Sequence, residues 1–302
     1  MSPALLIGAA GGLAQHVLDA LSTGSLYAMF ALGIALIFGI VRLVNFAQGS
    51  VIMGAAYALV IADSWPILLK FAFTVVVAVG LSLVVDRLAF RPFRTASPAT
   101  LLVTSFTVGS LFQAVAELAD NDQPQYAAVS PWLDGSFRIG DVVIARVSVI
   151  TLVVTVLLMG ALVVFLRRSS LGTQMRAAAE NFQMAQALGV RSNRVIGAAF
   201  AISGALAGVG AFFYIAVSGT VRPTIGFTPL LFGFVGTVIG GLGSIPGAVA
   251  GGFFLGALTE VLQTVLPQDL VPYTNAIVFS VVFAVLVLRP QGLFGSTAGE
   301  RV

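Results

Sequence analysis

The sequence predicts an all-α, polytopic integral membrane protein with about eight or nine transmembrane helices, some broken or re-entrant, and a cytoplasmic C-terminus. Of its 302 residues, 58% are hydrophobic and 9% are charged, whereas soluble domains carry about 25% charged residues. The apolar stretches run well past the ~10 alternating residues of a barrel strand, so helices are the expected spanning elements. We therefore exclude a water-soluble globule and expect one transmembrane domain over residues 1–302.

Nine apolar segments recur along the chain, and a bilayer core requires about 20 helical residues. They lie at 18–41, 47–63, 66–87, 99–119, 143–166, 193–217, 227–242, 247–265 and 274–289. The segments 47–63, 227–242 and 274–289 are marginal in length, which is typical of broken or re-entrant helices. Residues 1–18 contain no Lys or Arg, so we expect no signal peptide and direct insertion by a spanning helix.

The positions of lysine and arginine predict the orientation, because cytoplasmic loops carry an excess of both. If the polar segment 167–194 is cytoplasmic, strict alternation places eleven basic residues inside and four outside. This bias puts the C-terminus inside and explains the net charge of +3 without nucleic-acid binding. It also makes 120–142 an external loop, which is polar and long enough to form a small docking surface. That loop carries Asp120, Asp122, Asp134, Asp141, Pro124 and Pro131.

The polar segment 167–194 is the longest interruption of this apolar chain. We predict one helix in it, Gln174 to Leu188, with Thr173 as the N-cap. Gly189 stands where a left-handed residue would end that helix. A loop that only returned the chain would need a handful of residues, so we expect this one to have a function.

Small side chains dominate the predicted cytoplasmic helix, at about 172–190, because five of its residues are alanine. Arg176, Glu180 and Gln183 share one face at spacing i, i+4, i+7. A short helix of small side chains outside the bilayer offers a surface that another protein can approach closely.

Glycine pairs at GxxxG spacing are dense in the later part of the chain. They are Gly204 and Gly208, Gly236 and Gly240, Gly247 and Gly251, and Gly252 and Gly256. Such pairs let membrane helices approach closely, so they indicate either ordinary bundle packing or a mobile gate. The run from Gly243 to Gly247 contains Pro246 and predicts a tight cytoplasmic turn between two short helices, an arrangement that transporters use near a central site.

Sequence signatures of enzymes are absent. Nothing matches the GxxxxGK[ST] nucleotide loop or a GxSxG elbow, and the chain has no cysteine. Lys70 is its only lysine, and His16, its only histidine, is expected in an interfacial or capping role. We therefore predict no catalytic residue, no metal site and no cofactor bound by this chain.

Polar residues inside apolar segments are the candidates for function, because they are expensive at bilayer depth. Asp86 and Glu117 lie near helix ends and are expected to be structural. The run Asn45–Gly49 contains residues that are poor choices for a lipid-facing position. It either lines a translocation path or forms interhelical hydrogen bonds. The predicted path residues are Asn45, Phe46, Gln48, Gly49 and Glu260.

Intramembrane ionisable residues are too few for an ordinary proton- or ion-coupled transporter. The energy for transport is therefore expected from a separate ATPase that acts on the cytoplasmic helix. A channel or secondary transporter is the alternative, but it leaves that helix without a role. A membrane-embedded enzyme would need a cluster of polar residues within the bilayer, and the sequence shows none.

Four blocks of sequence carry a resemblance to a known family. They are GSLYAMFALGIALIFGIVRLVNFAQGSVIMGAAY at 24–57, DRLAFRPFRTAS at 86–97, RAAAENFQMAQALGV at 176–190, and GGLGSIPGAVAGG at 240–252 with RPQGLFG at 289–295. Together they span nearly the whole chain. By these blocks the chain resembles the permeases of high-affinity branched-chain amino acid ABC importers, the LivH/LivM type.

The resemblance implies a single permease domain that moves branched-chain amino acids, or a similar small polar solute, from a periplasmic binding protein across the bacterial inner membrane. It implies a second, related permease, with a heterodimer favoured over a homodimer, and two cytoplasmic ABC ATPases that bind ATP and Mg. In the family, closure of the ATPases pushes on a coupling helix, here about 172–190, and switches access. The matched coupling positions are Arg176, Ala177, Glu180, Asn181, Ala185 and Gly189.

One position departs from the family pattern. The family commonly has His in an Asn-Phe-Ala-His-Gly block, where this chain has Gln48. If that side chain senses the solute, the ligand could differ from leucine, isoleucine or valine. Related systems also carry urea, short amides and aromatic acids.

Overall fold

Helices form most of the computed structural model, which describes residues 3–94, 96–120, 123–133, 135–139, 142–288 and 292. Within these residues, seven helices are long and apolar enough to cross a membrane, and two apolar helices are shorter. The long ones are α1 (Pro3–Val41), α3 (Ile67–Val85) with the π-helical η1 (Asp86–Phe90), α4 (Pro98–Asp120), α5 (Arg146–Arg168), α8 (Ser192–Ser218), α10 (Ile245–Val265), and α11 (Thr274–Leu288) with the 3₁₀-helical η2 (Gln268–Tyr273). The short ones are α2 (Gln48–Ile61) and α9 (Phe227–Gly240).

Each of the nine predicted apolar segments therefore corresponds to a helix. Two of the marginal segments, 47–63 and 227–242, are the short helices α2 and α9. The third, 274–289, is extended by η2, and the two together reach 21 residues, Gln268–Leu288. The first helix begins earlier than predicted, at Pro3 instead of residue 18.

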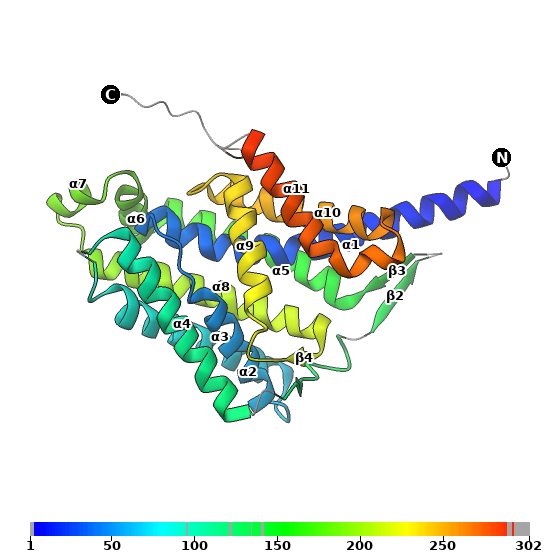
Figure 1. Ribbon diagram of the computed structural model, residues 1–302, viewed down its shortest axis with the longest axis horizontal. Helices are drawn as coiled ribbons and strands as arrows, with labels where there is room; N and C mark the ends of the chain where they lie inside the picture. Colours follow the sequence, from blue (N-terminus) through cyan, green and yellow to red (C-terminus); the bar gives the residue numbers. More distant parts are fainter. Residues whose placement is uncertain are drawn as a thin grey trace.

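Helix α1 is the centre of the bundle and runs along the long axis of the molecule (Figure 1). It packs against α10, α9, α8 and α5. The contact with α10 is very close: a Cβ on Gly256 would lie 2.2 Å from the backbone nitrogen of Gly24, and one on Gly252 would lie 2.4 Å from the Cα of Ala28. On the other side of the bundle, Gly204 and Gly208 of α8 pack in the same way on α3. The close packing predicted for these glycine pairs is confirmed.

The external loop 120–142 is more regular than predicted. Strand β1 (Gln125–Tyr126) pairs antiparallel with β4 (Thr220–Val221), and β2 (Ser136–Ile139) forms a hairpin with β3 (Val142–Ala145). Lys70 Nζ donates to the Ala128 carbonyl at 2.9 Å and fastens the loop to α3. Three aspartates of this loop, Asp122, Asp134 and Asp141, lie outside the described residues. The same is true of Arg289, of Arg301 and of the 289–295 motif apart from Gly292.

The predicted cytoplasmic helix Gln174–Leu188 is in fact two helices, α6 (Ser170–Glu180) and α7 (Phe182–Ala187). Asn181 separates them with an extended backbone (φ −149°, ψ 103°), and its Oδ1 accepts a hydrogen bond from the Met184 backbone nitrogen at 2.9 Å. An asparagine side chain that caps a helix stabilises a break better than it stabilises a helix interior.

The ends of this helical pair also differ in part from the prediction. Ser169, not Thr173, is the N-cap, and its Oγ accepts from the Gly172 backbone nitrogen at 2.8 Å. The predicted shared face is divided, because Gln183 belongs to α7. The left-handed Gly189 is confirmed, with φ of 89°.

Candidate translocation site and cytoplasmic cavity

The Asn45–Gly49 run lies between the end of α1 and the start of α2 and is held by hydrogen bonds. Asn45 Oδ1 accepts from the Ala47 backbone nitrogen at 3.1 Å, which begins the turn into α2. Gln48 Nε2 donates to the Ser203 carbonyl at 3.3 Å, and Ser203 Oγ donates to the Gly33 carbonyl at 2.9 Å. Asn45 and Gln48 are buried, so these amides connect α1, α2 and α8.

The start of α2 lies deep inside the membrane-spanning part of the molecule. Ser203, the hydrogen-bond partner of Gln48 in α2, is near the middle of α8 (Ser192–Ser218). Gly33, which accepts from Ser203, is well inside the span Gln15–Val41. With 14 residues, α2 is about 21 Å long and is too short to cross a bilayer core of about 30 Å. It therefore covers only part of the bilayer.

Helix α9 also has 14 residues and begins beside α2. A Cβ on Gly226, which precedes α9, would lie 1.8 Å from the carbonyl oxygen of Gly49, so the two backbones are in contact. From this point α2 leads to the loop where Lys70 binds Ala128, whereas α9 ends at the turn containing Gly243, which faces Gly39 near the end of α1. The two short helices thus run from one meeting point toward opposite sides of the bundle.

Two irregular segments, 42–47 and 222–226, meet where α2 and α9 begin. Irregular backbone at membrane depth is tolerated where it is buried in protein or lines a water-filled cavity. A cleft of about 70 Å³ lies at this junction, between the start of α2, the middle of α4 and the start of α9. It is lined by Phe46, Gly49, Ser50, Met53, Phe106, Gly109, Ser110, Gln113, Pro223, Thr224, Gly226, Phe227 and Leu230.

The structure separates the predicted path residues into three groups. Phe46 and Gly49 line the cleft, while Asn45 and Gln48 are buried behind it and position the segment. Glu260 is not part of the cleft: its Oε1 lies 3.0 Å from His16 Nδ1, in a contact between α10 and α1. This pair could not be predicted from the sequence, because the two residues are 244 positions apart.

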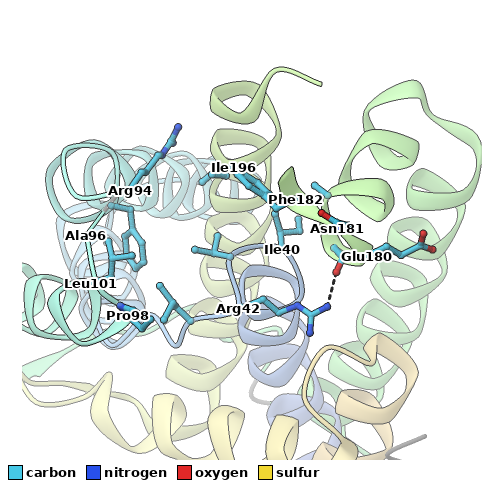
Figure 2. Close-up of a pocket in the computed structure, with 15 residues that line it drawn as sticks. Ile40, Arg42, Arg94, Ala96, Pro98, Leu101, Glu180, Asn181, Phe182 and Ile196 are labelled. Carbon is cyan, nitrogen blue, oxygen red and sulfur yellow. Dashed lines mark hydrogen bonds between the residues drawn. The ribbon is translucent and has the colours of Figure 1, made fainter. Parts of the chain in front are cut away.

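A larger cavity of about 500 Å³ lies at the end of the molecule predicted to be cytoplasmic, between the end of α1, the start of α4 and the α6–α7 pair (Figure 2). Glu180, Asn181 and Phe182 line one wall. Arg42 lies at the edge of the cavity and donates from Nη2 to the Ala179 carbonyl of α6 at 2.7 Å, the bond drawn in Figure 2.

A second arginine anchors the other wall of this cavity. Arg94 Nη2 lies 3.1 Å from Asp86 Oδ1, and Arg94 Nη1 donates to Asn193 Oδ1 at the start of α8. Asp86 is buried in the π-helical turn η1, and Thr104 of α4 donates to the Ala89 carbonyl in the same turn at 3.0 Å. The expected structural role of Asp86 fits this placement, because the network joins η1, α4 and α8.

The predicted coupling positions differ in exposure. Five of them are exposed: Arg176, Ala177, Glu180, Asn181 and Gly189. Ala185 is buried, with 4% of its surface exposed, so its side chain packs against the chain's own helices.

Sequence reasoning missed the most exposed apolar side chains of this region. Met184 is 60% exposed and Leu188, four residues later, is 80% exposed. The spacing of Met184 and Leu188 in an otherwise polar segment was the available signal.

Comparison with known proteins identifies the family. The chain matches the family model described as "Branched-chain amino acid transport system / permease component" over residues 16–288. The chain belongs to this family. It is 33% identical over 304 residues to the high-affinity branched-chain amino acid transport system permease protein BraD of Pseudomonas aeruginosa, with 95% of this chain and 97% of BraD covered.

Two further comparisons agree. The chain is 30% identical to the permease protein LivH of Escherichia coli K12, with 95% of this chain and 97% of LivH covered. Its fold is similar to that of an inward-facing metal-chelate type ABC transporter, with a TM-score of 0.53, 20% identity, and coverage of 91% of this chain and 85% of the other. By its family and these relatives, the chain is a permease component of a transport system, and the seven long apolar helices of its described residues make it a multi-pass membrane protein.

Proposed function

We propose that this permease carries branched-chain amino acids, or a similar small polar solute, from a periplasmic binding protein into the cytoplasm. It works in the bacterial inner membrane beside a second, related permease, in a heterodimer. Two cytoplasmic ABC ATPases bind ATP and Mg and supply the energy. The named relatives BraD and LivH support the solute class, because both are permeases of branched-chain amino acid systems.

The hydrogen bond from Arg42 to the Ala179 carbonyl is the observation that carries the mechanism. It joins α6, at the cytoplasmic end, to the chain segment that reaches the membrane centre at Gln48. Since only residues 43–47 lie between Arg42 and α2, a displacement of α6 acts directly on the Asn45–Gly49 run. We propose that this connection converts movement of the ATPases into a change of access.

The α6–α7 pair is the proposed contact with the ATPase. The exposed side chains of Met184 and Leu188 form an apolar projection, and a cleft in a partner would bury it. Arg176, Glu180 and Asn181 surround it with polar groups, while Ala185 holds α7 against the bundle. The cavity of about 500 Å³ behind this pair leaves space for α6 and α7 to move relative to α1 and α4.

The meeting point of α2 and α9 is the proposed centre of the translocation path. Phe46 and Gly49 form part of its wall, and the buried amides of Asn45 and Gln48 fix its shape. Short helices that start at the membrane centre and expose irregular backbone are the arrangement from which transporters build central sites.

Transport in vesicles tests the proposal. The purified permease is reconstituted with its partner permease, ATPases and binding protein, and uptake of labelled leucine is measured with and without ATP. We expect uptake that requires both ATP and the ATPases. Saturable leucine flux through the permease without the ATPases would contradict the proposal and favour a channel or secondary transporter.

A further inference from the structure

The exposed surface of α4 has two unlike edges. Phe106, Ser110, Gln113 and Glu117 follow one another at helical spacing and form what we call the polar edge. Gln113 Nε2 donates to Glu117 Oε1 at 2.9 Å. Phe106, Ser110 and Glu117 are exposed, and Gln113 is half-buried. The exposed residues around the adjacent arc are mainly apolar and include Val103, Thr107, Leu111, Ala114, Val115 and Leu118.

The polar edge borders the cleft between α2 and α9. Ser110 and Gln113 are among the residues that line it. Two hydrogen bonds hold α4 beside α2 at this level: Ser50 Oγ donates to the Gly109 carbonyl at 2.8 Å, and the Phe46 backbone nitrogen donates to Ser105 Oγ at 3.4 Å. From Ser110 the edge leads outward to Glu117, three residues before the end of α4 at Asp120.

Lipid is a poor neighbour for such an edge. Gln113 lies six residues before the end of the span Pro98–Ala119, where an amide facing hydrocarbon is costly, so we expect it to face the interior of a bundle or a water-filled cavity. Glu117 lies at the outer end of the same span. The apolar arc of the same helix needs no such environment. The two edges therefore face different surroundings, and the polar one faces the side on which the cleft opens.

We propose that the polar edge of α4 is the wall of the outer half of the translocation path, and that the Gln113–Glu117 pair contacts the ammonium group of the transported amino acid. This inference rests on the proposed function. An ammonium group supplies three donors to a carboxylate and a carbonyl oxygen, and such charge-assisted hydrogen bonds are short and strong. The exposed rings of Phe106 and Phe227, 63% and 62% exposed, suit the apolar side chain of the same solute. The solute class is a small zwitterion with an apolar side chain.

Cysteine labelling tests the position of the wall, because the chain contains no cysteine of its own. Ser110→Cys and Gln113→Cys lie on the polar edge, and Leu111→Cys and Val115→Cys lie on the apolar arc at matching depth. The assembled complex in vesicles is treated with a charged, membrane-impermeant thiosulfonate reagent. This is done with and without leucine-loaded binding protein and ATP.

We expect the polar-edge cysteines to react about tenfold faster than the apolar-arc cysteines, since a charged reagent does not enter hydrocarbon. Leucine transport should slow the reaction at residue 113. Equal rates on both edges would overturn the inference. Unreactive polar-edge cysteines would also overturn it, because the second permease would then cover the edge. Reaction that leucine leaves unchanged would overturn the proposed solute contact.

Glu117→Gln tests the charge itself. It keeps the size of the side chain and one acceptor but removes the carboxylate, so leucine uptake should fall about tenfold, the loss expected for one charge-assisted hydrogen bond. Leu118→Met, on the apolar arc, changes an exposed side chain without adding a polar group; it is the control and should transport normally. Wild-type uptake in Glu117→Gln would contradict the inference. Wild-type vesicles that fail to take up leucine with ATP would instead contradict the proposed function.

Discussion

At the scale of single residues, Arg42 combines an unusual backbone with a specific contact. Its φ of 58° is the only left-handed one among the described non-glycine residues, and this conformation costs an L-residue about 1 kcal/mol or more. It turns the chain sharply after α1 and places the guanidinium against α6. The geometry of one residue thus determines both where the segment 43–47 begins and how it is connected to α6.

Replacing Arg42 by Ala should uncouple the transporter. The variant loses the hydrogen bond to the Ala179 carbonyl, so ATP hydrolysis by the assembled complex should continue while leucine moved per ATP falls several-fold. Arg42→Lys keeps a charged donor and should retain part of the coupling. The measurement is the ratio of leucine uptake to phosphate release in vesicles. A wild-type ratio in Arg42→Ala would count against a coupling role.

Gly226→Ala should disrupt the meeting point of α2 and α9. Its Cβ would lie 1.8 Å from the Gly49 carbonyl oxygen, so backbone must shift, and overpacking of this kind costs about 1–3 kcal/mol. We expect a lower unfolding temperature and loss of transport. Gly160→Ala in α5 is the matched control, because nothing lies within 4 Å of the added carbon. Equal stability of the two variants would show that the contact is not close.

Residue identity predicted which residues belong to this site, but not which of them line the cleft and which hold the helices together. The Asn45–Gly49 run was recognised because amides and glycine are poor lipid-facing residues. Whether an amide lines a path or joins helices depends on its partner, and the partner of Gln48 is Ser203, 155 positions away. For Glu260 the missing information was the same, since only the fold brings His16 beside it.

At the scale of elements, the split between α6 and α7 decides which side chains the cytoplasmic region presents. A continuous helix would have placed Gln183 in line with Arg176 and Glu180. The break at Asn181 instead turns α7 so that Ala185 packs inward and Met184 and Leu188 point outward. Composition predicted a helical region there. The spacing of residues does not show whether Asn181 continues one helix or caps a second one, so the break was not predicted.

Removing the apolar projection should weaken assembly. In Met184→Ser with Leu188→Ser, the partner cleft loses two side chains that each contribute about 1.5–3 kcal/mol when fully buried. We expect much less ATPase to co-purify with the permease, with membrane insertion unchanged. Gln183→Ser, also exposed on α7, is the control. Normal co-purification of the double variant would contradict docking through this projection.

Ala185→Glu should act differently, because residue 185 is buried. A carboxylate forced into that position lacks a charge partner and destabilises the fold by several kcal/mol. We expect loss of the folded permease itself, seen as a lower unfolding temperature in detergent without any ATPase present. If the variant is as stable as wild type and fails only in assembly, Ala185 belongs to the docking surface after all.

At the scale of the whole molecule, charged contacts lie near the ends of the membrane spans. In the described part of the chain the ion pairs are His16 with Glu260, Lys70 with Asp63, and Arg94 with Asp86. The membrane-spanning interior is instead held by close glycine contacts and buried apolar side chains. Such an interior has few groups that could couple transport to protons or ions, which agrees with an energy source in partner subunits.

The bilayer explains why the helices were predictable from sequence and other features were not. Hydrocarbon thickness forces long apolar runs, so each of the nine segments was visible without a structure. The β1–β4 pair and the two edges of α4 depend on contacts between distant segments, and composition carries no record of those. The meeting of Gly49 with Gly226 is the clearest case, because both segments appeared only as short or irregular stretches.

The central claim is that movement of the cytoplasmic helices reaches the membrane centre through Arg42. Spin labels on cysteines at Ser110 and Thr224, two exposed residues that line the cleft from α4 and from the segment before α9, measure its width in the assembled complex. We expect ATP to change this distance in the otherwise wild-type permease, and we expect Arg42→Ala to abolish the change while ATP is still hydrolysed. An equal change in both proteins, or none in the wild type, would contradict it.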